Sequence, residues 1–318
     1  MTRRGLQITL GVLWLLDAGL QFQPYMFTTK FAVEVIDPAG AGQVPFVSTP
    51  IEHVVNVISA HPAPYNAVFA SVQLAIGLGL LLRRTVVPAL VASIVWSLSV
   101  WYLGEGLGGL TGHNPALLAG APGAALLYAI LAVAAWPNNH KLPASWLVFA
   151  WAGYWVGGAI LQVWRGPRIG PDLAATVSES ANGAPGWLSR IDFSLARTLG
   201  HVSPGFVAGW IGVQVLIGLA AFAPRRARRI AVLAGCLIAV GFWIIGPGFD
   251  QLISGHGTDP NTPPLVVIIG VAIFAYHRRS HVLGMSDDRR HDASADDSRF
   301  GRDQPRHGDA APATVRAT

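Results

Sequence analysis

The 318-residue chain is 52% hydrophobic and only 12% charged, about half the charged fraction of a soluble domain. Its mean hydropathy of +0.45 also argues against a soluble globular protein. The formal net charge of +5 does not indicate nucleic-acid binding, because the basic residues stand mainly in pairs at the ends of apolar runs. The composition predicts an all-α membrane protein whose surroundings are the lipid bilayer, with no nucleic-acid partner.

Eight mostly apolar runs follow one another along the chain, and a helix needs about 20 such residues to cross a bilayer. A polar connection of about forty residues follows the first run, and a second polar connection spans Arg165–His201. The last run is short for a full crossing. We predict transmembrane helices over Leu6–Phe22, Tyr65–Leu82, Val86–Leu103, Pro115–Trp136, Ser145–Trp164, Gly205–Ala223, Ile230–Ile245 and Pro264–Tyr276.

The basic residues divide unevenly between the two sides of this predicted bundle. Short segments on one side hold eleven Lys and Arg residues, whereas two long loops on the other hold five. The positive-inside rule then places both termini in the cytoplasm and both long loops outside. Arg outnumbers Lys by 20 to 2, which is typical of a GC-rich bacterial genome. We therefore predict a multi-pass protein of the bacterial cytoplasmic (inner) membrane.

The two halves of the sequence share landmarks at a nearly constant spacing. Trp155 and Gln162 fall 141 residues after Trp14 and Gln21. The Gly-rich stretch 101–113, which ends in Gly-His, recurs as 243–256. An even number of helices per copy gives both copies one orientation. We predict two parallel four-helix repeats, 1–141 and 142–283, followed by a polar, disordered cytoplasmic tail, 284–318.

A first candidate site consists of polar residues inside apolar runs. Asp17 is the only acid deep in a predicted helix, and an ionised carboxylate near the bilayer centre costs about 2.5–3.5 kcal/mol on insertion scales. It should therefore face the bundle interior, as a proton relay or a hydrogen-bond partner for a quinone head group. The alternative is a structural role in which Asp17 bonds Gln21 one turn on. The candidate site comprises Asp17, Gln21, Gln73 and Gln214.

A second candidate site lies at the outer rim, after the third helix of each repeat. Its glycines let the backbone leave helical geometry, and exposed backbone groups can then bind ions or polar head groups. No tight metal-ligand motif is present, so we predict no metal site and favour a glycine-rich turn with positive φ angles and a polar cap. The residues are Gly104, Glu105, Gly106, His113, Gly246, Gly248, Asp250 and His256.

Each half resembles the DoxX/DoxD-type membrane proteins. The resemblance rests on the pattern of Trp14–Pro24, where a helix ends in a Gly-containing polar stretch and Pro, and on the Gly- and Leu-rich helix Gln73–Leu82 that leads to Arg83-Arg84. It covers about Leu6–Trp136 and, more faintly, Ser145–Tyr276. The double length and the absence of a lysine near Gln23-Pro24 depart from the family pattern. The resemblance implies association with redox or quinol-linked membrane complexes.

Three functional hypotheses follow from these patterns. The first is an accessory, non-catalytic component of membrane redox or stress functions, with other membrane subunits as partners and a quinone as the only cofactor that the resemblance implies. The second is a small-solute or ion transporter with a path between the two repeats, using Asp17 and the Gly-rich breaks. The third is an enzyme that acts on lipid or quinone at the outer face. The sequence names no substrate.

Overall fold

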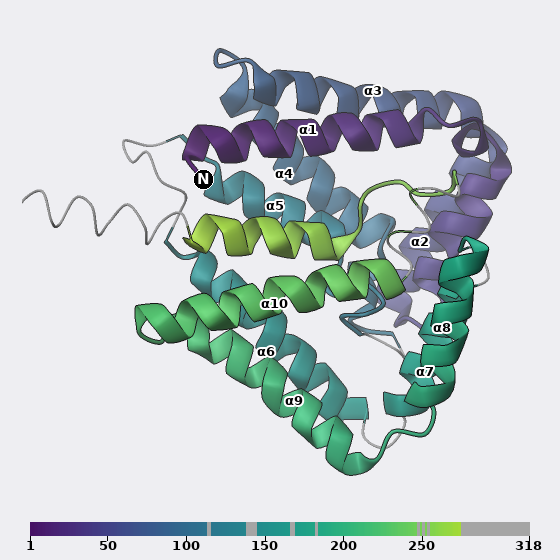
Figure 1. Cartoon of the computed structure of the whole chain (residues 1–318). Helices are drawn as coiled ribbons and strands as arrows, with labels where there is room; N and C mark the ends of the chain where they lie inside the picture. The colour runs from purple at the N-terminus through teal and green to yellow at the C-terminus, as the bar shows by residue number, and fades with distance from the viewer. Residues whose placement is uncertain are drawn as a thin grey trace, which may run out of the picture. The chain divides into compact units, whose positions relative to one another are not determined.

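The computed structural model is all-helical across the residues it describes, with no strand among them (Figure 1). Five of its helices are long and apolar enough to cross a bilayer: α3 (Pro62–Leu81), α4 (Val86–Leu103), α6 (Leu147–Arg165), α9 (Pro204–Leu219) and α10 (Arg225–Ile245). The tail predicted to be disordered lies outside the described residues, which are 1–112, 116–137, 145–165, 169–181, 184–246, 249, 252 and 255–274.

Helix α1 (Arg3–Gln21) lies along α3, and the two helices approach closely at glycines. The helix begins at Thr2, whose hydroxyl accepts a hydrogen bond from the Gly5 N–H at 3.0 Å. A Cβ added at Gly77 would lie 3.0 Å from the carbonyl oxygen of Gly11 and 2.8 Å from Leu15 Cγ. Small residues permit such close contact between helices in a bilayer, where no hydrophobic force drives them together.

The pair formed by α6 and α9 shows the same type of contact. A Cβ added at Gly218 would lie 3.3 Å from the carbonyl oxygen of Ala152 and 2.8 Å from Val156 Cγ2. Two pairs of long helices therefore pack through one glycine, one backbone carbonyl and one aliphatic side chain each.

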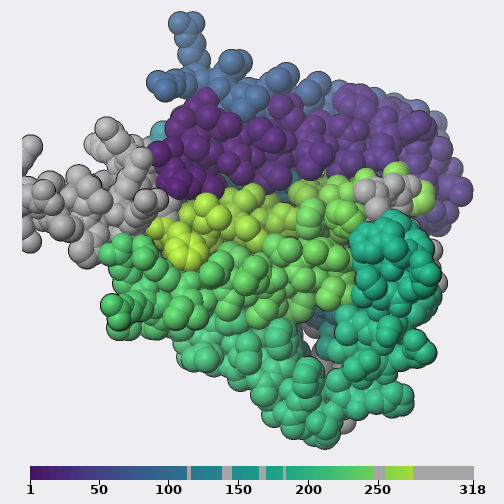
Figure 2. Space-filling model, in the orientation of Figure 1, coloured from purple at the N-terminus to yellow at the C-terminus, as the bar shows by residue number. Residues whose placement is uncertain are grey.

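One continuous apolar core joins the first and second halves of the chain. Tyr128 of α5 (Ala124–Ala134) and Trp151 of α6 both lie in it, fully buried. The helix Thr262–Phe274 closes it: a Cβ added at Gly270 would lie 2.5 Å from Cys236 Sγ on α10. Figure 2 shows the side chains of Thr262–Phe274 filling the space between those of α1 and α10.

The bundle has two chemically distinct ends. At one, Arg4 donates to the carbonyl oxygen of Leu80 at 3.0 Å, and Gln7 donates to that of Ala135 at 2.9 Å. The α3–α4 connection and the start of α10, both rich in arginine, lie on this side (Figure 1); we call it the arginine end. The opposite end carries α2 (Pro45–Ala60), and we call it the α2 end.

Both long connections contain more structure than the sequence predicted. The first holds η1 (Pro24–Phe27), η2 (Phe31–Ile36), η3 (Asp37–Gly40) and α2, and the second holds α7 (Ile169–Ala181) and α8 (Gly186–Leu199). In α2, buried Val47, Ile51, Val55 and Ile58 recur at helical spacing and form a small core with Met26 and Phe31. These connections are amphipathic caps on the bundle rather than polar loops.

The fourth predicted helix is shorter than expected, and the eighth begins earlier than expected. The sequence predicted a crossing over Pro115–Trp136, but Ala116–Gly123 forms turns and α5 begins only at Ala124. Gly120 and Gly123 have φ angles of 98° and 105°, outside the helical region. The last helix, Thr262–Phe274, begins two residues before the predicted Pro264. The prediction of α4, Val86–Leu103, matches the observed bounds.

Candidate functional site

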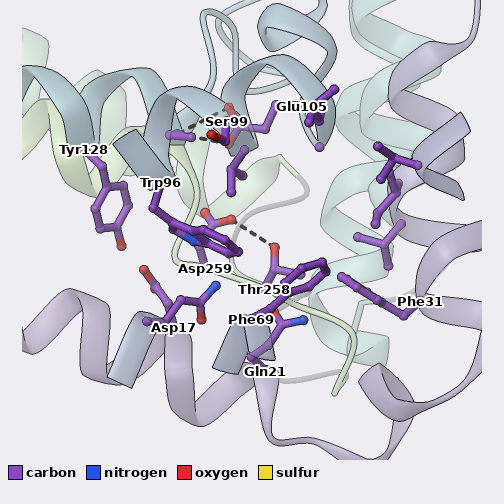
Figure 3. Close-up of a pocket in the computed structure, with 18 of the residues that line it drawn as sticks. Asp17, Gln21, Phe31, Phe69, Trp96, Ser99, Glu105, Tyr128, Thr258 and Asp259 are labelled. Atoms are coloured by element: carbon purple, nitrogen blue, oxygen red, sulfur yellow. Dashed lines mark hydrogen bonds between the residues drawn. The ribbon is translucent and has the colours of Figure 1, made fainter. Parts of the chain in front are cut away.

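A cavity of about 230 Å³ lies at the α2 end of the bundle. Its walls come from α1, α3, α4 and α5, and η2, α2 and the segment 258–259 lie over it (Figure 3). Its volume is below the range of about 300–1,000 Å³ typical of sites for drug-sized ligands. The polar side chains that line it are Asp17, Gln21, Gln73, Ser99, Glu105, Tyr128, Thr258 and Asp259, and the aromatic ones include Trp14, Phe31, Phe69 and Trp96.

Asp17 lies on α1 and is only 2% exposed. The Tyr128 hydroxyl points at its carboxylate (Figure 3), and the Tyr128 ring lies 4.7 Å from the Trp14 ring, whose Nε1 donates to Ser93 Oγ at 2.9 Å. Asp17 Oδ1 has no hydrogen-bond partner among the described residues. The helix thus delivers a buried carboxylate with unused acceptor capacity to the cavity.

Gln21 is not the hydrogen-bond partner of Asp17, so the structural role considered for this pair is wrong. The Gln21 side chain instead donates to Asn66 Oδ1, and Asn66 Nδ2 donates back to the Gln21 carbonyl oxygen at 2.9 Å. This reciprocal pair joins the end of α1 to the start of α3. An amide satisfied in this way has less capacity left for a neighbouring carboxylate.

Glu105 follows the end of α4 and accepts hydrogen bonds from the start of α5. The Ala125 N–H lies 3.0 Å from Oε1 and 3.3 Å from Oε2. A carboxylate is stabilised there because the first N–H groups of a helix lack intrahelical partners. The carboxylate needs Gly123, since a Cβ at that position would lie 2.3 Å from Glu105 Oε2. Glu105 therefore both caps α5 and lines the cavity.

Asp259 comes from the second half of the chain. Thr258 Oγ1 donates to its Oδ2 at 3.0 Å, and the Asn261 N–H donates to its Oδ1 at 2.6 Å. The segment around it is fastened by Trp243 Nε1, which donates to the Pro260 carbonyl oxygen at 2.9 Å, and by Thr262 Oγ1, which donates to that of Gly120 at 2.5 Å. The hydrogen bond from Thr262 to Gly120 thereby joins this segment to the first half of the chain, and Asp259 lines the cavity beside α1, α3, α4 and α5.

The carboxyls outside the helices are difficult to ionise. Burial and, to a lesser extent, the charge of Asp259 raise the pKa of Glu105 to about 8, against hydrogen bonds from the Ala125 and Ala124 amides that lower it. Burial also raises the pKa of Asp259, against hydrogen bonds from Asn261 and Thr258. None of the described residues that line the cavity is basic. The protein provides acidic groups here without a cation to pair with them.

No family model, curated protein or solved structure matches this chain.

Aromatic rings form the side of the cavity nearest α2. The Phe31 and Phe69 ring centroids lie 6.5 Å apart edge to face, and those of Phe69 and Trp96 lie 5.5 Å apart. Trp96 Nε1 and Gln73 Oε1 are both buried without a hydrogen-bond partner among the described residues. Phe31 and Phe69 lie on the side of the cavity away from Tyr128 (Figure 3), and a lining of rings and carboxyls suits a small ligand with an apolar body and a polar end.

The structure brings together part of each predicted site. Asp17, Gln21 and Gln73 line one cavity with Gly104 and Glu105. Gln214 is wrongly grouped with them: it is fully buried in α9 and does not line the cavity.

The other rim residues have separate roles. Gly106 has the positive φ predicted for the turn, 54°. A Cβ added at this position would lie 2.2 Å from the Ala39 carbonyl oxygen, so a side chain does not fit there. Gly246 caps α10 through its N–H, which donates to the Phe242 carbonyl oxygen at 2.8 Å. His256 is exposed, and its ring lies 4.2 Å from that of Tyr25. His113, Gly248 and Asp250 lie outside the described residues. Within those that are described, no group of three or more His, Cys, Asp or Glu side chains is arranged to hold a metal ion.

Sequence reasoning missed Asp259, Tyr128 and Trp96. Asp259 carried a usable signal, because it follows Gly255-His256 at the predicted rim and precedes the last apolar run. Tyr128 lies in the middle of an apolar run, where a buried hydroxyl usually needs a partner. Trp96 carried none, because it lies inside α4 and nothing in the sequence separates it from the other tryptophans of the chain.

Proposed function

We propose that this protein is a multi-pass, DoxX-like accessory protein of the bacterial cytoplasmic membrane, and that its cavity binds a small molecule from the outer side. In this proposal eight helices cross the membrane as two four-helix units in one orientation, with both termini in the cytoplasm. The observation that carries the binding role is the cavity itself, where Asp17, Glu105 and Asp259 meet without a basic partner among the described lining residues.

The duplication is supported by contacts as well as by sequence spacing. Gly11, Leu15 and Gly77 of the first half correspond, 141 residues on, to Ala152, Val156 and Gly218, and these two sets make the same helix contact. The corresponding tryptophans Trp101 and Trp243 also donate to proline carbonyl oxygens, of Pro122 at 2.7 Å and of Pro260 at 2.9 Å, although these prolines follow their tryptophans by 21 and 17 residues. Chance similarity between apolar helices does not account for paired contacts of this kind.

The proposed orientation is supported by the arginine end. Short connections rich in arginine gather there, which the positive-inside rule assigns to the cytoplasm. The cavity then opens toward the outer side. A test uses a Cys236→Ala background with single substitutions Ser99→Cys, in the cavity lining, or Thr85→Cys, at the arginine end. A membrane-impermeant maleimide added to intact cells should label the first and spare the second; the reverse pattern excludes the orientation.

Binding is favoured over transport because the cavity ends at large buried side chains. Trp14 and Tyr128 are 4% and 1% exposed, respectively, and they lie between the cavity and the middle of the bundle. Transport remains the second candidate, because Asp259 brings the second half of the chain to the acids of the first. Substrate flux into proteoliposomes that is lost in Asp17→Asn would favour transport, whereas binding without flux would favour the accessory role.

The binding role is tested with three probes of similar size and different charge: 4-fluorobenzylamine, 4-fluorobenzyl alcohol and 4-fluorobenzoate. The protein in lipid nanodiscs is titrated with each while the ¹⁹F NMR line width is followed. Ser99→Trp should fill the cavity mouth and abolish binding. Ser71→Trp is the matched control, because both serines are exposed and donate to the carbonyl four residues earlier, but only Ser99 lines the cavity. If no probe shows binding that Ser99→Trp removes, the proposed function is wrong.

A further inference from the structure

We infer that the ligand of this cavity is a small organic ammonium ion, a primary amine with an apolar or aromatic body. This inference rests on the proposed binding function and specifies its chemistry. Three features of the cavity carry it: its uncompensated acids, its unpartnered acceptors and its aromatic side.

The three acids share the cavity without a cation supplied by the described residues that line it. Asp17, Glu105 and Asp259 come from α1, from the turn after α4 and from the segment before the last helix, so three separate parts of the chain converge. No Lys, Arg or His is among the described lining residues. Like charges in a desolvated site oppose one another's ionisation. A bound cation would relieve this opposition, and a neutral or anionic ligand would not.

The unused hydrogen-bond capacity indicates a ligand with several N–H donors. Asp17 Oδ1 and Gln73 Oε1 have no hydrogen-bond partner among the described residues, and their residues are only 2% and 8% exposed. The Tyr128 hydroxyl points at the Asp17 carboxylate (Figure 3), so it faces that group as a donor rather than as a free acceptor. Buried polar groups in native proteins are usually paired, and an N–H donor on a ligand would satisfy Asp17 Oδ1 and Gln73 Oε1. A primary ammonium group offers three N–H donors and no acceptor.

The aromatic side distinguishes an organic cation from a hydrated inorganic one. Phe31, Phe69 and Trp96 line the cavity, and their successive ring centroids lie 6.5 and 5.5 Å apart. Aromatic faces attract cations and accept apolar bodies, whereas a small metal ion prefers a shell of oxygen or nitrogen ligands. Figure 3 shows Phe31 and Phe69 on the side away from Tyr128. An ammonium end can therefore reach Asp17 while the body lies against the rings.

A quinone head group fits the same features less well. Its carbonyl oxygens are acceptors only, so they would face Asp17 Oδ1 and Gln73 Oε1 without donors between them. Trp96 Nε1 is a donor without a partner, which a hydroxyl or ether oxygen on the body of an amine would satisfy.

The experiment compares the same three fluorinated probes at pH 7, where a primary amine is protonated. We expect 4-fluorobenzylamine to bind at least 10-fold more tightly than 4-fluorobenzyl alcohol, and 4-fluorobenzoate to bind most weakly. Asp17→Asn keeps the side-chain shape but removes the charge, and it should weaken amine binding about 10-fold while leaving alcohol binding nearly unchanged. Glu52→Gln is the control for general surface charge, because Glu52 is exposed on α2 and does not line the cavity.

The possible results separate this inference from the proposed function. Equal affinity for the amine and the alcohol, or tighter binding of the benzoate, would overturn the ammonium ligand and leave a general binding cavity. Displacement of the amine by equimolar magnesium or calcium chloride would also overturn it, in favour of an inorganic cation. The absence of binding by every probe would reject both. Loss of amine binding in Asp17→Asn but not in Glu52→Gln supports the inference.

Discussion

Replacing Gly123 with alanine tests whether the Glu105 carboxylate caps α5. The substitution should cost more than the backbone strain of a side chain at a positive φ angle. The added Cβ would lie 2.3 Å from Glu105 Oε2 and 2.9 Å from Trp101 Cδ1, closer than real Cβ contacts. The carboxylate must then leave the start of α5, where it accepts a hydrogen bond from the Ala125 N–H. Gly123 also has a φ of 105°, which disfavours any residue with a side chain.

The expected loss of stability has two parts. A side chain in a sparsely populated backbone region costs about 1–3 kcal/mol. Loss of a helix cap costs about 0.5–2 kcal/mol more. We expect Gly123→Ala to lower the free energy of unfolding by about 1.5–5 kcal/mol, the sum of these two costs. The matched control is Gly109→Ala: Gly109 has a φ of 74°, but no heavy atom would lie within 4 Å of its added Cβ. The control should therefore show the backbone cost alone.

The measurement is a reversible unfolding titration in mixed micelles with SDS, followed by circular dichroism. Gly123→Ala should be less stable than Gly109→Ala by the cost of the lost cap. In a Glu105→Ala background, the effect of Gly123→Ala should fall toward that of Gly109→Ala, because its main steric conflict is gone. Equal effects of the two glycine substitutions in the wild-type background would refute the assignment of Glu105 to the start of α5.

Three further predictions concern helix contact, pH and the loop that carries Asp259. Gly218→Ala should destabilise the protein by about 1–3 kcal/mol through overpacking, whereas Gly212→Ala, where no atom lies within 4 Å, should stabilise it by about 0.5–1 kcal/mol in the same titration. Burial and the charge of Asp259 raise the pKa of Glu105 from 4.5 to about 8, and Tyr128 is a further titratable neighbour. As pH rises, the unfolded chain therefore loses the Glu105 proton before the folded protein does, so the free energy of unfolding should fall between about pH 4.5 and about pH 8. It should fall less steeply with pH in Glu105→Gln. The same dependence on pH in both proteins would contradict the raised pKa. Trp243→Phe removes the hydrogen bond to the Pro260 carbonyl oxygen, so it should lower the free energy of unfolding by about 1 kcal/mol. It should also weaken 4-fluorobenzylamine binding in the ¹⁹F titration. Unaltered binding would mean that this bond does not position Asp259.

Hydropathy predicted the long helices well because their apolar character is a local property. The bounds of α4 match the prediction, and α3 and α6 begin within three residues of it. The same signal failed at Ala116–Gly123, where Ala, Gly and Leu are apolar whether or not the backbone is helical. It also missed α2, because apolar residues at helical spacing were scattered through a connection that is polar on average.

The candidate site was predictable only in part for a related reason. Asp17 and Glu105 stand out in sequence, as an acid within an apolar helix and an acid within a glycine-rich turn. Their meeting depends on the packing of α1, α4 and α5, which hydropathy does not encode. Gln73 and Gln214 occupy equivalent sequence positions, yet only Gln73 lines the cavity. The first half has Asp17 where the second has Gly158, so equivalent helices present different chemistry.

The sequence by itself determined that this protein is helical and suited to a membrane, and where its glycine-rich turns lie, because hydropathy and backbone freedom are properties of short stretches. Only the tertiary structure decided that Asp17, Glu105 and Asp259 share one cavity. These residues are far apart along the chain, and contacts such as the hydrogen bond from Thr262 to the Gly120 carbonyl oxygen join the segment of the last one to the first half. Such contacts form only when distant segments have folded against each other.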